Sequence, residues 1–303
     1  MLDSFSQSAA AEPARAGVLY LAVAFGIWGF MPLFIRQLLH VPAMEILAHR
    51  VLWSLVFLGL VLTASGRWRE IQAGLRSPRL LGLLAITTML LAVNWLLFIL
   101  AVNGGQSLQV SLGYYINPLV SVILGFVLLG ERLTAVQWLA VAVAAAGVVG
   151  LAVDAGVVPY YGLGVAASFG IYGYVRKIAP IEAVTGLAIE TALLAPFAAG
   201  YLIWLGAGDT GAFAAIYRRT DFFLIVSGLV TALPLIGFTA GARRVRLVTV
   251  GLMQYTAPSI QFVVALSLFD EPFSRGHAIA FGCIWTALAL YSWNLLRERR
   301  SPP

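Results

Sequence analysis

The chain consists largely of apolar runs of about 20 residues, the length that a helix needs to cross the hydrocarbon core of a bilayer. Of its 303 residues, 61% are hydrophobic and 11% are charged, and the mean hydropathy is +0.92, which sets it apart from soluble domains. Because lipid offers no hydrogen-bond partners to the backbone, each run is predicted to be a helix. We therefore predict an all-α membrane protein. Ten transmembrane helices are expected, at residues 17–36, 43–63, 80–102, 107–130, 134–153, 159–177, 183–205, 222–241, 248–269 and 276–295.

The net charge of +6 follows a topological pattern. If the N-terminus is cytoplasmic, 14 of the 19 Lys and Arg residues fall in cytoplasmic segments. The positive-inside rule then predicts that both termini are cytoplasmic and that the 206–221 loop is external. The charge is a topology signal, and binding of nucleic acid is not expected. The first run has only Arg15 before it and no convincing cleavage site after it, so we expect it to remain as a helix.

Part of the sequence occurs twice. Residues 110–131 match residues 250–271 at an offset of 140, with Tyr115, Pro118 and Glu131 aligned to Tyr255, Pro258 and Glu271. Residues 25–30 likewise resemble residues 169–174. This predicts a first repeat at 12–153 and a second at 154–299. Since each repeat has an odd number of spans, five, the two are expected to be inverted, as in transporters whose site lies between repeats.

Polar and aromatic side chains form stripes on the third, fourth, eighth and ninth spans, at matching depths in the two repeats. Polar groups facing lipid cost free energy, so the stripes are predicted to line a central cavity. The alternative is that small and polar residues only pack helices together. The residues predicted to line the cavity and bind substrate are Trp28, Asn94, Trp95, Phe98, Ser111, Tyr114, Tyr115, Tyr172, Phe238, Gln254 and Tyr255.

Pro118 and Pro258 lie within spans at equivalent places, where each removes a backbone donor and favours a kink. Matching breaks in two repeats indicate hinges near a substrate site. A static kink is the alternative reading for either proline alone.

Few charges are found at membrane depth, namely His49, Arg50 and Glu190. The offset aligns Arg50 with Glu190, so opposite charges occupy equivalent places. Each is a candidate gate, proton carrier or structural pair, and gating or structural roles are favoured. Glu131 and Glu271 are expected to connect helices.

Several functional classes are excluded by what the sequence lacks. It has no GxxxxGK[ST] motif, so it contains no site of this kind for ATP. Its three His residues and the single Cys283 have no metal-ligand spacing. No cofactor or metal is expected. The expected partners are a small-molecule substrate and the lipid bilayer, with the chain acting as a monomer or a homodimer.

Six segments together resemble the RarD-like branch of the drug/metabolite transporter superfamily, of the EamA type. They lie at residues 45–54, 94–98, 111–119, 129–132, 137–141 and 185–191, and include ILAHR, NWLLF and SLGYYINPL. The likeness extends over residues 17–296. It implies ten helices in two inverted EamA repeats around a central cavity, residence in the bacterial inner membrane, and export of small metabolites. It further implies kinship with YddG-like exporters of aromatic and other neutral amino acids.

An aromatic, mildly polar cavity suits neutral solutes with hydrophobic side chains. We therefore expect a secondary transporter that exports neutral or aromatic amino acids by alternating access. Efflux of drug-like amphiphiles of the chloramphenicol type is the alternative within transport. A membrane enzyme or sensor is a further alternative, but an enzyme would show clustered His, Cys or carboxylates at membrane depth. The coupling ion is left open.

Overall fold

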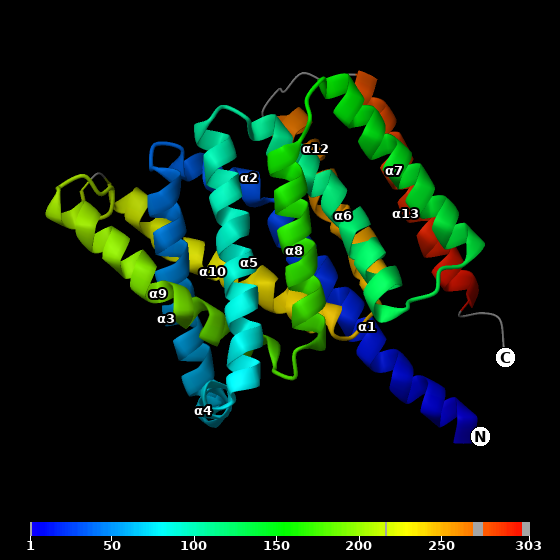
Figure 1. Cartoon of the computed structure of the whole chain (residues 1–303), viewed down its shortest axis with the longest axis horizontal. Coiled ribbons are helices and arrows are strands. Elements are labelled where there is room, and N and C mark those ends of the chain that lie inside the picture. Colours follow the sequence, from blue (N-terminus) through cyan, green and yellow to red (C-terminus); the bar gives the residue numbers. More distant parts are fainter. Residues whose placement is uncertain (1, 216, 269–274, 299–303) are drawn as a thin grey trace. The chain divides into compact units, whose positions relative to one another are not determined.

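The computed structural model describes residues 2–215, 217–268 and 275–298, and every element in these ranges is a helix (Figure 1). An all-α fold is thereby confirmed. Glu271 lies outside the described residues. The helices are α1 (Leu2–Gly29), α2 (Met31–Ile35), η1 (Arg36–Leu38), α3 (Ala43–Ser65), α4 (Trp68–Arg76), α5 (Pro78–Asn103), α6 (Ser107–Leu129), α7 (Ala135–Ala155), α8 (Tyr160–Ile178), α9 (Ala183–Ala207), α10 (Arg218–Ala242), α11 (Leu247–Gln254), α12 (Thr256–Leu268) and α13 (Arg275–Glu298).

Within the described residues, eight segments are long and apolar enough to cross a membrane. They are Ala14–Leu38, Ala43–Ser65, Pro78–Asn103, Ser107–Leu129, Ala135–Ala155, Ala183–Ala207, Arg218–Ala242 and Leu247–Leu268. The other two predicted spans coincide with α8 and α13, which are helices but are not among these eight. A count of ten spans therefore stays a prediction.

Large apolar side chains are exposed along these helices. Val153, Phe197 and Ile203 are 75%, 78% and 71% exposed. Apolar surface of this extent is unfavourable in water. It fits helices whose outer faces contact lipid, as expected of a multi-pass membrane protein.

Local sequence explains where several helices begin and end. Thr134 and Gln137 form a reciprocal capping box at the start of α7. Gly66, Gly130 and Gly156 follow α3, α6 and α7 with φ values of 67°, 63° and 63°. Glycine adopts this left-handed conformation without the steric cost of a Cβ, so it ends a helix readily.

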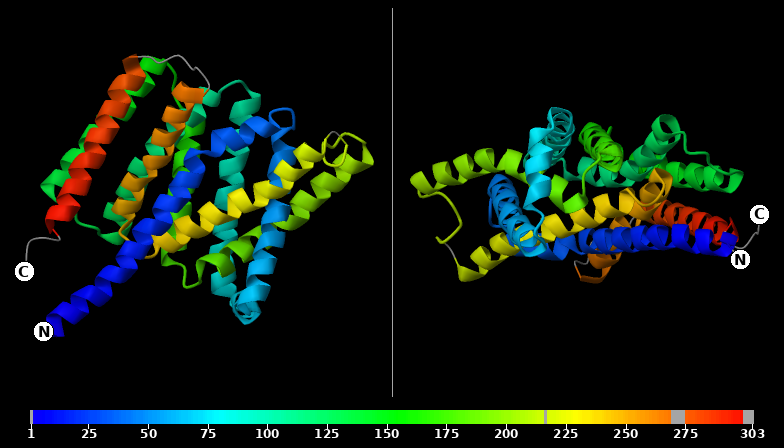
Figure 2. Two further views of the ribbon diagram at one scale, coloured as in Figure 1. Left: turned by 180° about the vertical axis from the view of Figure 1, so that it is seen from behind. Right: turned by 90° about the horizontal axis from the view of Figure 1, so that it is seen from below.

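One compact unit consists of Met1–Trp95 and Val175–Arg244. Within it, α10 packs against α1, α3 and α9, and α3 also packs against α9. Figure 2 shows α3 crossing α10. A Cβ on Gly228 would lie only 2.3 Å from the carbonyl carbon of Trp53, so this crossing requires a glycine. The close approach places the inner faces of α3 and α10 together.

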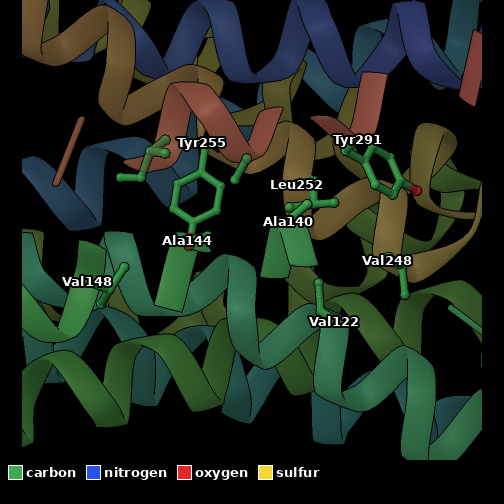
Figure 3. Packing of buried hydrophobic residues seen from close by; sticks show 10 residues of the cluster. Val122, Ala140, Ala144, Val148, Val248, Leu252, Tyr255 and Tyr291 are labelled. Carbon is green, nitrogen blue, oxygen red and sulfur yellow. The ribbon is translucent and has the colours of Figure 1, made fainter. Parts of the chain in front are cut away.

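The other compact unit consists of Leu96–Tyr174 and Val245–Pro303. In it, α7 lies beside α13 and α6 lies beside α11 (Figures 1 and 2). Its core joins α6, α7, α11 and α13 through small side chains such as Ala140 and Ala144 and the ring of Tyr255 (Figure 3). Glu131 connects helices, as expected, because its carboxylate accepts hydrogen bonds from the first two amides of α11, Leu247 at 2.6 Å and Val248 at 2.9 Å.

Each compact unit takes helices from both predicted repeats, 12–153 and 154–299. The boundary between units falls within α5 and within α8. The division of the chain into compact units therefore does not coincide with its predicted division into repeats. The repeat boundary and the inverted orientation therefore stay predictions.

Candidate functional site

A narrow, partly open pocket lies within the first compact unit, among membrane-spanning helices α3, α5, α9 and α10. The space that it encloses is small, about 10 Å³, which is enough for about one water molecule. Most of its wall is apolar, and a minority of the lining residues are polar. The lining residues are Arg50, Val51, Ser54, Leu91, Trp95, Leu187, Glu190, Thr191, Leu194, Thr231, Ala232 and Leu235.

Arg50 projects into this pocket from α3 and is held in place by two neighbours. Its Nε donates a hydrogen bond to Thr231 Oγ1 at 2.7 Å. The guanidinium carbon lies 5.7 Å from the centre of the Trp95 ring, within the range of a cation–π contact. One turn further along α3, the Ser54 hydroxyl donates to the Gly228 carbonyl at 2.8 Å. The contact between α3 and α10 therefore fixes the position of Arg50 on α3 relative to Thr231 on α10.

Glu190 reaches the same pocket from α9 and is 1% exposed. Its carboxylate accepts a hydrogen bond from Thr87 Oγ1 at 2.5 Å, and Arg176 Nε lies 3.5 Å away. Arg176 is fully buried and also donates to the Ala183 carbonyl. Two opposite charges at this depth stabilise each other, whereas either alone would be costly.

His49 lies one residue from Arg50 but belongs to a different contact. Its ring lies 4.9 Å from the ring of Phe213, and its Nε2 is 4.0 Å from Glu45 Oε1. Glu45 Oε1 accepts hydrogen bonds from the amides of Ala212 and Phe213. Glu45 and His49 thus hold the chain between α9 and α10 against α3, and His49 does not line the pocket.

Of the residues predicted to line a cavity, Trp95 lines the pocket. Trp28 and Phe238 lie in the same unit and contact each other, with ring centres 6.0 Å apart. Asn94 is half-buried on α5. The structure thus brings Arg50, Trp95 and Glu190 together, with Trp28 and Phe238 in a separate aromatic cluster.

The other predicted lining residues belong to the second unit. Tyr172 and Tyr255 are fully buried, and the Tyr255 ring extends toward Ala144 in the core (Figure 3). Gln254 accepts a hydrogen bond from Ser121. Tyr115 is half-buried against Phe281, and the remaining three are exposed: Phe98, Ser111 and Tyr114. A cavity formed by these residues stays a prediction.

The two predicted hinge prolines sit in different local structures. Pro118 lies inside the uninterrupted helix α6. The ninth span is interrupted at Tyr255, so Pro258 is the third residue of α12. An amide at that position has no partner within its helix, so this proline costs no hydrogen bond. Gly251 packs against α6 at Pro118, because a Cβ there would lie 2.6 Å from the Pro118 carbonyl oxygen.

Sequence reasoning missed two residues that shape the pocket region. Thr231 is one polar residue among several in the eighth predicted span, and nothing in the sequence pattern singles it out as the partner of Arg50. Arg176 lies near the end of an apolar run and reads as a cytoplasmic basic residue. A long side chain near a helix end can turn back into the bundle, and the sequence does not record that direction.

The model of the EamA-like transporter family matches residues 15–153. An uncharacterized transporter of Vibrio cholerae is 43% identical over 286 residues, covering 94% of this chain and 95% of the relative. Protein RarD of Escherichia coli is 40% identical, covering 96% and 98%. The chloramphenicol-sensitive protein RarD of Pseudomonas aeruginosa is 30% identical, covering 94% and 96%.

A protein of known crystal structure has the same fold, with a TM-score of 0.70 over 90% of this chain and 96% of that one, at 19% sequence identity. That identity is low, so this likeness speaks for the fold alone. The relatives named RarD match nearly the whole chain, and the family model matches its first half. The chain therefore belongs to the RarD-like, EamA-type transporters of the drug/metabolite transporter superfamily.

Proposed function

We propose that this membrane transporter exports small metabolites, foremost neutral or aromatic amino acids, across the bacterial inner membrane. Both termini lie in the cytoplasm, and the two inverted repeats alternate access to a central cavity. The observation that carries the proposal is the pocket among α3, α5, α9 and α10, where Trp95 and several leucines surround a few polar groups. Such a mixture suits a solute with an apolar body and a small polar head.

The energy for export comes from a solute or ion gradient, because the sequence contains no phosphate-binding motif for ATP. Binding shifts a conformational equilibrium only by its differential affinity for the two states. A substrate that fits both the inward-open and outward-open forms is therefore carried down its own gradient. Coupling to protons requires a group whose protonation differs between the states.

A second candidate substrate class is the drug-like amphiphile. The observation in its favour is the 30% identical relative from Pseudomonas aeruginosa, which is named for chloramphenicol sensitivity. Chloramphenicol combines an aromatic ring with uncharged polar groups. It is the appropriate competitor against which to test amino acids.

Counterflow in proteoliposomes tests the proposal. Vesicles loaded with one unlabelled solute take up its labelled form only if the protein carries it. We expect counterflow with phenylalanine, leucine or other neutral amino acids, and none in protein-free vesicles. Uptake repeated with an imposed pH gradient reports proton coupling. Counterflow of chloramphenicol without that of any amino acid would replace the proposal by the second candidate, and counterflow of neither would contradict both.

A further inference from the structure

We infer that helix α4, together with the first turn of α5, is a surface that binds the headgroups of anionic phospholipids. Three exposed arginines, Arg69, Arg76 and Arg79, lie there beside an exposed apolar edge formed by Trp68 and Leu75. We call these five residues the α4 surface. Its partner is a lipid of the membrane and differs from the transported solute, so the inference does not depend on the proposed function.

The first step is the position of α4 relative to the bilayer. Helix α3 is long and apolar enough to span a membrane and ends at Ser65, and α5, which is likewise, begins at Pro78. The nine residues of α4 fill the connection between them, so α4 lies where two spans leave the membrane. Figure 1 shows α4 almost end-on, whereas α3 and α5 run along the picture, so α4 lies crosswise to both. A helix that lies in the plane of the membrane surface has this direction.

The second step is the distribution of side chains around α4. Successive residues of a helix point about 100° apart, so Trp68, Ile71 and Leu75 fall within an arc of about 60°. Arg69 and Arg76 follow Trp68 and Leu75 directly and therefore point to one adjoining side of this arc. A helix divided in this way into an apolar and a basic face is typical of helices at a lipid interface.

The third step is that protein contacts cover only part of the apolar face. Ile71 packs against a buried cluster that includes Ile189 of α9. A Cβ on Gly74 would lie 2.9 Å from Cδ1 of Ile189, so this side of α4 is in close contact with α9. Trp68 and Leu75, by contrast, are 48% and 50% exposed. Next to two membrane spans, apolar side chains that protein leaves uncovered contact lipid, and Trp is enriched at the level of the headgroups.

The fourth step is the charge of this region. From the end of α3 to the first turn of α5, the chain contains four arginines and one glutamate, a net charge of +3. Glu70 forms its ion pair with Arg67, at 2.8 Å. Among the described residues, no ion pair engages Arg69, Arg76 or Arg79. Negatively charged headgroups complement these arginines, and each basic residue near a membrane surface adds to the attraction.

The apolar edge and the arginines together identify the partner. A free phosphate ion or an acidic protein complements the arginines but not an apolar edge beside the membrane. A phospholipid supplies both a phosphate for the arginines and acyl chains for Trp68 and Leu75. A zwitterionic lipid has the same chains without net charge. The α4 surface is therefore expected to prefer anionic over zwitterionic lipids.

Native mass spectrometry of the purified full-length protein tests this preference. The protein is mixed with equal amounts of phosphatidylglycerol and phosphatidylcholine that carry the same acyl chains, and the lipids that stay bound are identified by mass. We expect phosphatidylglycerol to bind about tenfold more tightly, and the variant R69Q/R76Q/R79Q to reduce this preference below about threefold.

The matched control is R36Q/R218Q/R219Q, which removes three exposed arginines from another part of the same compact unit. The control should keep the preference. No preference in the wild-type protein, or an equal loss in the control, would leave the arginines of α4 a role in orientation alone and overturn the inference.

Hydrogen exchange locates the lipid on α4 without any substitution. The α4 amides are compared in nanodiscs of phosphatidylcholine and in nanodiscs of equal parts phosphatidylcholine and phosphatidylglycerol. We expect exchange to slow several-fold with phosphatidylglycerol, and the difference to shrink at high salt, because salt screens exposed charges. Equal exchange in the two nanodiscs would refute the site, even if the triple variant did not fold. Inorganic phosphate that slowed exchange equally in phosphatidylcholine would make the partner a free anion, contrary to the inference.

Leu75 and Ala73 supply a matched pair of variants for the apolar edge. Both are exposed on α4, but they point about 160° apart. We expect L75Q to speed exchange of the α4 amides in either kind of nanodisc, because it places a polar group against the acyl chains. A73Q, on the opposite side, should exchange like the wild-type protein. Equal effects of L75Q and A73Q would show that the apolar edge does not contact lipid and would contradict the inference.

Discussion

Arg176 and Glu190 form an ion pair that is almost completely withdrawn from solvent, with side chains 0% and 1% exposed. Removing two charges from water is expensive, and the attraction between them recovers that cost only while both are present. The backbone contributes as well, because Gly186 leaves room for the guanidinium, whose Nη1 would lie 2.1 Å from a Cβ there. The pair makes this part of the unit sensitive to any change in a single partner.

We predict that E190Q destabilises the protein by about 3–5 kcal/mol, because Arg176 then keeps a buried charge without a counter-charge. The double variant R176M/E190L, which removes both charges at similar volume, should recover much of that loss. Thermal unfolding in detergent measures both. The control is E182Q at the more exposed pair with Arg243, for which we expect a loss of less than about 1 kcal/mol. If the double variant were no more stable than E190Q, the uncompensated charge of Arg176 would not be the cause of the lost stability.

Arg50 and Glu190 could be predicted as notable residues from the sequence because charged residues are rare in its apolar runs. Their convergence on one pocket follows from the crossing of α3, α9 and α10, which no sequence spacing records. His49 belongs to the same short motif as Arg50, yet its ring faces Phe213. Neighbouring residues on a helix point about 100° apart, so adjacency in a motif does not mean a shared site.

Helix crossings in this protein depend on individual glycines. The α3–α10 crossing is the clearest case, because a Cβ on Gly228 would also lie 2.4 Å from the Ser54 amide nitrogen. Backbone atoms cannot move aside as a side chain can. Small residues at such contacts let membrane helices approach closely.

We predict that G228A destabilises the protein and disturbs the pocket, since the added methyl group must push α10 away from α3 and so weaken the Arg50–Thr231 bond. The matched control is G59A on α3, where a Cβ would meet nothing within 4 Å. G59A should be neutral or slightly stabilising, by up to about 1 kcal/mol. The melting temperatures of the two variants are the measurement. A G228A variant as stable as G59A would contradict the geometry of the crossing.

The short helix α4 is tied to α9 by a carboxylate outside the membrane-spanning segments. Glu70 accepts a hydrogen bond from Thr185 Oγ1 at 2.7 Å, and Arg67 Nε donates to it at 2.8 Å. These hydrogen bonds, that from Thr185 first, lower the pKa of Glu70 below its usual value of 4.5. A carboxylate with a lowered pKa stabilises the folded state above the unfolded pKa, and that contribution is lost as the pH falls through the folded pKa.

We therefore predict that the attachment of α4 is unchanged from pH 7 down to about pH 5 and weakens below about pH 4. Hydrogen exchange of the α4 amides, followed by mass spectrometry across this range, reports the change. In E70Q, exchange should already be faster at pH 7 and should show no further loss in this window. If the α4 amides of the wild-type protein exchanged as fast as those of E70Q at pH 7, the Glu70 carboxylate would not be the group that holds α4 against α9.

Elements were largely predictable because apolar length is a strong signal for a membrane helix. Two spans are exceptions. The first, expected as one helix at 17–36, is observed as the end of α1 followed by α2 and η1. The ninth, expected as one helix at 248–269, is observed as α11 and α12 with Tyr255 between them. Pro258 indicates a weakness in that helix. The exact place of the interruption depends on how α11 packs against α6, where Gly251 meets Pro118.

For the whole molecule, the distribution of basic residues predicts that the 206–221 loop is external and that the C-terminal end is cytoplasmic. In a Cys283→Ala background, a cysteine at Thr210 should react with a membrane-impermeant maleimide added to intact cells. A cysteine at Ser301 should react only after the cells are opened. The reverse pattern would invert the topology and contradict the proposed orientation of the repeats.

Pro118 and Pro258 are predicted to affect motion more than affinity. We expect P118A or P258A to slow counterflow while substrate binding stays close to wild type. In P118A, helix α6 gains a backbone donor and bends less readily. In P258A, the fixed φ of proline next to the interruption at Tyr255 is lost. The rate is normalised to folded protein, measured by size-exclusion chromatography. Unchanged rates in both variants would leave the prolines a purely static role.

The repeat in the sequence shows duplication, but it does not show how the chain is partitioned in space. The first compact unit takes α1 and α3 from the first half and α9 and α10 from the second. Alignment of two halves compares positions that resemble each other. Packing joins positions that complement each other, such as Arg50 with Thr231, and these share no likeness in sequence.

That interleaving has a consequence for biosynthesis. Arg50 finds Thr231 only after a further 181 residues have been made. At about 5–20 residues per second, the ribosome needs roughly 10 to 40 s to supply the partner. Through that interval the nascent α3 carries an arginine at membrane depth without the threonine that later holds it. Water, lipid headgroups or the insertion machinery must solvate that charge until α10 arrives, so the protein is most vulnerable to quality-control proteases before its second half has entered the membrane.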